Sequence, residues 1–78
     1  MLTGKRFRLM TATLAIDSSG EKRIAVTVPA GSVIEVIRGP RPNDTRMVHV
    51  RWNTRVLVMF TADVEGRGQE VTGRTAGA

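Results

Sequence analysis

The sequence has no cysteine and only one histidine, and these absences exclude two kinds of site. Without cysteine the chain can form neither a disulfide nor a thiolate metal site. His49 has only scattered acidic residues as companions, so we expect no metal centre and no cofactor. A chain of 78 residues builds one domain with a small stability margin, and we expect tight packing or self-association to stabilise it.

Aromatic residues and long apolar runs are also scarce. There is no tyrosine, one tryptophan and two phenylalanines. No stretch approaches the roughly 18 apolar residues of a membrane span. No apolar run follows the basic residues at the N-terminus, so we expect no signal peptide and, with cysteine also lacking, a cytoplasmic protein that does not bind membranes.

Positive charge is what the sequence has in excess. The net charge is +5, and it comes from ten arginines and two lysines set against seven acidic residues. Such a balance is typical of proteins that bind nucleic acid or an acidic partner. The same charges, scattered as they are, also fit a solvated surface, and composition alone leaves both interpretations open.

Short β-branched runs alternate with turn residues, which predicts an all-β fold. We expect strands at 6–16, with a bend near 10–13, and at 23–28, 32–38, 47–52 and 56–61. A 3₁₀ turn at 61–66 precedes a short last strand at 69–72, and residues 74–78 form a flexible tail. We therefore assign residues 1–66 to a barrel domain and residues 67–78 to the last strand and the tail.

The hairpin at 47–61 allows two registers, because its loop can have two or three residues. A two-residue loop at 53–54 pairs Val50 with Leu57. A three-residue loop pairs Val50 with Val58 and Val48 with Phe60, which gathers β-branched and aromatic residues on one face. A slip of one residue turns every side chain over. We expect the three-residue loop, with Phe60 in the core and Leu57 outside.

The pattern resembles a small bacterial-type SH3-like β-barrel with five strands and a 3₁₀ turn before the last one. Four segments carry the resemblance: VPAGSVIEV (28–36), MVHVRW (47–52), VLVMF (56–60) and ADVE (62–65). Peptide-binding barrels of this kind grip proline-rich segments with exposed aromatics, which this chain lacks. The size is also similar to that of the type II dihydrofolate reductases, tetramers of such barrels, but their Val-Gln-Ile-Tyr segment is absent.

Residues for catalysis are few. His49 lies in the middle of an expected strand, and Ser18, Ser19 and Ser32 fall in turns without a marked base. Asp63 and Glu65 are close together but lie in the expected 3₁₀ turn, where such residues cap or face solvent. We therefore expect a protein that is not an enzyme, although a site formed between subunits stays open.

The leading hypothesis is a binding or scaffolding module that self-associates through an outer apolar sheet face. Methionine is enriched in protein interfaces, and monomers rarely expose such a face. Alternatively, the chain's own first strand covers this face. The expected interface residues are Val33, Ile37, Met47, His49, Leu57 and Met59.

The alternative is a nucleic-acid-binding barrel that uses an arginine-rich surface. Small barrels bind strands with positive grooves and exposed aromatic platforms, and here the aromatics are expected inside. The basic residues available are Lys5, Arg6, Arg8, Arg38, Arg41, Arg46, Arg51 and Arg55. From these we select six as candidate nucleic-acid ligands: Lys5, Arg6, Arg8, Arg46, Arg51 and Arg55.

Overall fold

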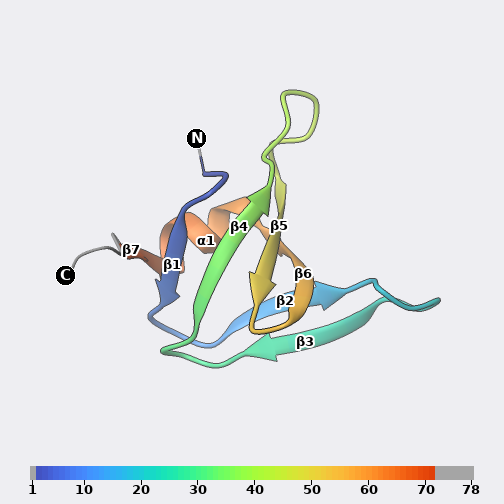
Figure 1. The fold of residues 1–78 in the computed structure, drawn as a ribbon, viewed down its shortest axis with the longest axis horizontal. Coiled ribbons are helices and arrows are strands. Elements are labelled where there is room, and N and C mark those ends of the chain that lie inside the picture. Colours follow the sequence, from blue (N-terminus) through green and yellow to red (C-terminus); the bar gives the residue numbers. More distant parts are fainter. Residues whose placement is uncertain (1, 72–78) are drawn as a thin grey trace.

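The computed structural model describes residues 2–71, which form one antiparallel sheet and a short helix (Figure 1). The strand order across the sheet is β3-β2-β6-β5-β4-β1-β7, so β3 and β7 are the two edges. In chain order the elements are β1 (Arg6–Leu9), β2 (Thr13–Asp17), β3 (Ile24–Val28), β4 (Val33–Arg38), β5 (Met47–Trp52), β6 (Arg55–Phe60), α1 (Thr61–Arg67) and β7 (Gly68–Val71).

The all-β prediction is confirmed, but the prediction of a five-stranded barrel is wrong. The sheet has seven strands and is open. One extra strand arises because the expected first strand, 6–16, is two strands. β1 pairs with β4 and β7, whereas β2 pairs with β3 and β6. The predicted bend lies between them, and after it Thr13 and Ala15 take the buried positions, while Leu14 is exposed and Ile16 is half-buried.

The β5–β6 hairpin has a two-residue turn, so the expected three-residue register is wrong. The ladder pairs Val50 with Leu57 and Trp52 with Arg55. Asn53 begins the turn with φ of 58°, and two-residue hairpins of the favoured types need a positive φ at this position, which asparagine tolerates. The local turn geometry therefore fixes the register and brings Leu57, not Val56, into the core.

The helix α1 replaces the expected 3₁₀ turn and packs its buried Val64 into the core. Gly68 follows it directly, and a Cβ there would lie 2.6 Å from the Val64 carbonyl oxygen and 3.1 Å from Phe7 Cβ. Glycine therefore permits β7 to begin against β1 without an intervening loop. The predicted last strand is confirmed one residue earlier than expected, and the predicted tail at 74–78 lies outside the described residues.

The core lies inside the curve of the sheet. Val48, Val50, Leu57 and Met59 line the β5–β6 side, and half-buried Trp52 packs against it. The remaining buried apolar residues come from the other elements: Phe7, Leu9, Ala15, Val28, Ile34, Val36 and Val64. Within residues 2–71, no helix has the length and apolar character required to cross a membrane.

Candidate functional site

The outer face of β2, β5 and β6 exposes a set of large apolar side chains. Leu14, Val56 and Phe60 are each almost half exposed, at 47%, 46% and 45%. Half-buried Ile16 and Val58 pair directly with each other on the same face. The β2–β3 hairpin therefore widens this face instead of covering it, contrary to the alternative in which the first strand acts as a lid.

The predicted interface residues divide between the outer face and the core. Met47 and His49 are half-buried on the outer face of β5, and Val33 lies exposed on β4. Leu57 and Met59 are buried at 0% and 1% exposure, so their predicted outward orientation is wrong. The two-residue turn is the physical reason, since it turned β6 over relative to the expectation.

Ile37, the sixth predicted interface residue, lies at a β-bulge. The β4–β5 register is regular as far as Val36 opposite Val50 and then shifts, so that Arg38 stands opposite His49. A bulge adds one residue to one strand and re-aims the side chains that follow it. Ile37 is half-buried as a result, and Arg38 joins the outer face beside His49.

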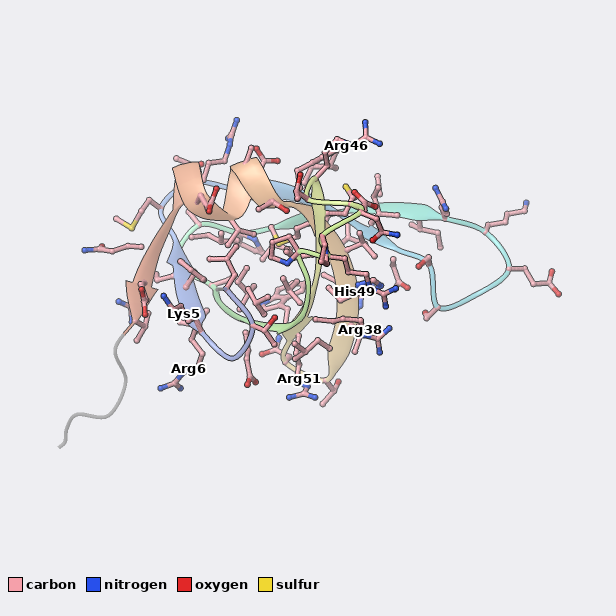
Figure 2. All side chains as sticks on the ribbon, turned by 90° about the horizontal axis from the view of Figure 1, so that it is seen from above. Lys5, Arg6, Arg38, Arg46, His49 and Arg51 are labelled. Carbon is pink, nitrogen blue, oxygen red and sulfur yellow. The ribbon has the colours of Figure 1, made fainter. Side chains whose placement is uncertain are left out.

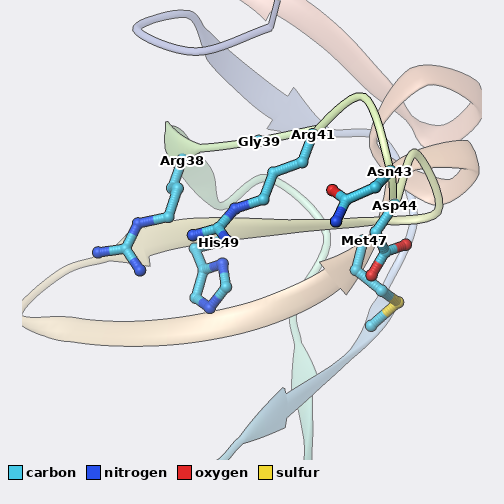
Figure 3. A pocket seen from close by; sticks show the side chains of 7 residues that line it. All are labelled: Arg38, Gly39, Arg41, Asn43, Asp44, Met47 and His49. Carbon is cyan, nitrogen blue, oxygen red and sulfur yellow. The ribbon is translucent and has the colours of Figure 1, made fainter.

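Two adjoining hollows on this face form what we call the His49 groove. Both are lined by Asp44, Met47 and His49, and their volumes are about 290 and 300 Å³. The first extends under the β4–β5 loop and is also lined by Arg38, Gly39, Arg41 and Asn43 (Figure 3). The second extends toward the β2–β3 hairpin and is also lined by Ile16, Ser18, Arg23 and Val58.

The β4–β5 loop is a folded wall of the groove. Arg41 and Asp44 exchange two backbone hydrogen bonds of 3.1 and 3.0 Å. The Asp44 carboxylate also accepts a hydrogen bond from the backbone N–H of Arg46. Gly39 has φ of 88°, and a Cβ there would lie 3.2 Å from the Met47 carbonyl oxygen, so only glycine brings this loop so close to β5.

On the side of the β2–β3 hairpin, an ion pair joins two hairpins next to the groove. Arg55, at the start of β6, donates a 2.8 Å hydrogen bond to Asp17 at the end of β2. This bond, with two further hydrogen bonds from Ser19, holds the pKa of the Asp17 carboxyl well below its usual range. The charged pair therefore fastens the β2–β3 hairpin to the β5–β6 hairpin beside the groove.

Six of the arginines in residues 2–71 have no acidic partner, and three of these line the groove. Salt bridges among the described residues join Lys5 to Glu70, Arg51 to Glu35, Arg55 to Asp17 and Arg67 to Asp63. Within residues 2–71, no carboxylate pairs with Arg23, Arg38 or Arg41. Figure 3 shows the side chains of Arg38 and Arg41 beside His49 at one end of the groove.

None of the six predicted nucleic-acid ligands lines the His49 groove. Lys5, Arg6 and Arg8 belong to β1 and the residue before it, and β4 separates this strand from the β5 strand of His49. Figure 2 shows Lys5 and Arg6 apart from Arg38 and His49. Arg51 and Arg55 are held by carboxylates, and Arg46 is exposed where the β4–β5 loop ends. Arg38 and Arg41 are among the basic residues considered from the sequence but not among the six selected ligands, and Arg23 is in neither set.

The groove also brings together a serine, a histidine and an aspartate, the residue types of nucleophilic catalysis. Ser18, His49 and Asp44 line the same hollow. Hydrogen bonds that would link Ser18 to His49, or His49 to Asp44, are lacking in the described part of the chain, and a relay requires both. Residues 2–71 also contain no group of three metal-ligating side chains.

Comparisons with protein-family models, with curated proteins and with solved structures found no match to this chain. A proposal of function therefore rests on the geometry of the groove.

Proposed function

We propose that this protein is a non-enzymatic binding module whose His49 groove binds single-stranded nucleic acid. The observation that carries the proposal is the set of three arginines, Arg23, Arg38 and Arg41, at the two ends of a groove with an apolar floor. An arginine without a carboxylate partner has its planar fork of donors available for a phosphate.

The floor of the groove suits unstacked bases. Phe60 is exposed and stands directly opposite Met47 across the ladder, so it neighbours a residue that lines the groove without lining the hollows itself. Aromatic rings on a positive surface are the platforms on which small β-domains stack successive bases. The expectation that placed the aromatics inside had weakened this interpretation, and the exposure of Phe60 supports it.

The dimensions of the groove favour a single strand over a duplex. Hollows of about 290 and 300 Å³ each accommodate groups the size of a base. In a duplex the faces of the bases are stacked and cannot reach the floor. Asp44 would repel a phosphate, but its carboxylate can accept a hydrogen bond from the amino group of a base.

The experiment is fluorescence anisotropy with labelled oligothymidylate and oligouridylate at low salt. We expect binding by the native protein and a loss of at least tenfold in affinity for Arg38→Gln/Arg41→Gln. The matched control is Arg6→Gln/Arg8→Gln, which removes the same charge from β1 outside the groove and retains most of the affinity. Absence of binding by the native protein, or equal loss in both variants, would reject the groove.

Self-association through the outer face is a second candidate, because Leu14, Val56 and Phe60 are exposed together. It competes with the first, since a second copy seated there would cover Phe60. Light scattering distinguishes them: Val56→Ser/Leu14→Ser should dissociate a face-to-face dimer, while leaving the groove arginines in place. A native protein that is monomeric at high concentration contradicts this candidate.

We also propose that the SH3-like resemblance describes the architecture of the five strands outside the β2–β3 hairpin. The run of neighbours β7-β1-β4-β5-β6 and the helical turn before the last strand support it. The β2–β3 hairpin then corresponds to a long loop of such a barrel that has become a pair of strands.

A further inference from the structure

β3 presents an unpaired edge of the sheet. It pairs with β2 on one side, and within the described residues no strand lies on its other side. A free edge offers a row of backbone N–H and C=O groups, and another extended strand is the partner that satisfies them in register. The occupant of this edge is therefore a β-strand, not a helix or a small molecule.

The two edges differ in how they resist such pairing. Proteins protect edges with charged side chains, proline or bulges. β7 is four residues long and includes Glu70, which forms a salt bridge with Lys5. β3 has the sequence IAVTV, with neither charge, proline nor bulge, and its Ile24 is 59% exposed. β3 is the edge that is open to strand addition.

The sequence of β3 is complementary to itself. In an antiparallel pair centred on Val26, Val26 faces Val26 of a second copy and Ala25 faces Thr27. Ile24 lies opposite position 28, where the valine side chain is buried in the core of its own copy. Directly opposite β-branched pairs such as Val26 with Val26 stabilise a sheet. The basic residues Lys22 and Arg23 precede the strand, so this register sets neither against a like charge in the β3 of the other copy.

We propose that two copies of this chain join through β3 in this antiparallel register. The two-fold axis runs perpendicular to the sheet, because antiparallel strands related by symmetry keep their faces on the same side. The outer faces of both copies then form one continuous surface. If the groove binds nucleic acid as proposed above, the dimer presents two grooves to one nucleic-acid strand. The pairing through β3 does not itself depend on that function.

The test introduces charged side chains at Ala25 and Thr27, which are both exposed. In Ala25→Lys/Thr27→Lys, each lysine at 25 faces a lysine at 27 of the other copy, and repulsion opposes pairing. In Ala25→Lys/Thr27→Glu, the same two contacts become attractive. Sedimentation equilibrium should show a dimer for the native protein, at least a tenfold weaker one for the first variant, and recovery in the second.

Two results would overturn the proposal. One is a native protein that sediments as a monomer at every concentration tested. The other is a dimer that does not use β3. Such a dimer would be equally strong in both charge variants, or would be dissociated by Val56→Ser/Leu14→Ser because it is formed by the outer face. Circular dichroism melting of each variant confirms that its fold is intact, and Thr54→Lys, in the β5–β6 turn, controls for added charge.

Discussion

Replacing Arg38 and Arg41 by glutamine should flatten the salt dependence of nucleic-acid binding. No carboxylate in residues 2–71 pairs with the three groove arginines, so each can neutralise one phosphate and release its counterion. For single strands the slope of log K against log salt is about −0.7 per phosphate contact. Three contacts give a slope of about −2, and one remaining contact gives about −0.7.

Between about 50 and 200 mM salt, these slopes weaken binding about 20-fold for the native protein and about threefold for the double variant. The assay is anisotropy with one labelled oligonucleotide across a salt series, which measures the slope apart from absolute affinity. A variant that binds weakly with an unchanged slope would refute the reasoning, because the loss would then come from structure and not from lost phosphate contacts.

Three further predictions concern stability and are measured by urea unfolding. Leu57→Ala should cost about 2–5 kcal/mol because it opens a cavity, whereas Val56→Ala should cost less than about 1 kcal/mol; the reverse order would contradict the two-residue turn. Asp17→Asn should lower the free energy of unfolding at neutral pH. The difference from the native protein should disappear as the pH falls below about 4, because the Asp17 carboxyl, whose pKa is lowered in the fold, stabilises it only while ionised. A difference that does not change with pH would contradict the ion pair. Gly68→Ala should cost about 1–3 kcal/mol through the clash with a helix carbonyl, whereas Gly66→Ala, with open space around it, should be neutral or stabilising.

Alternation of residue types predicted most strands but could not assign the faces of β6. Leu57 and Met59 on one face compete with Val56, Val58 and Phe60 on the other, and both sets are apolar. Hydrophobicity therefore does not decide the register, and the turn does. Asn53 was the available signal, since asparagine at the start of a two-residue turn favours a positive φ.

The candidate site was predicted less well, for a different reason. Met47 and His49 were placed on the outer face because β5 alternates regularly. Arg38 was not, because the bulge at Ile37 leaves no mark in the sequence. Arg41 and Arg23 reach the groove from a loop and a hairpin, and pairwise spacing along a chain does not specify how such segments fold back.

The two apolar faces of β6 give a single insertion an unusual consequence. One residue added between Asn53 and Thr54 would lengthen the turn and roll the strand by half a revolution. Leu57 and Met59 would then become solvent-facing, while Phe60 would enter the interior. Each arrangement has an apolar interior, so the length of one turn determines whether this domain displays an aromatic or a methionine on its outer face.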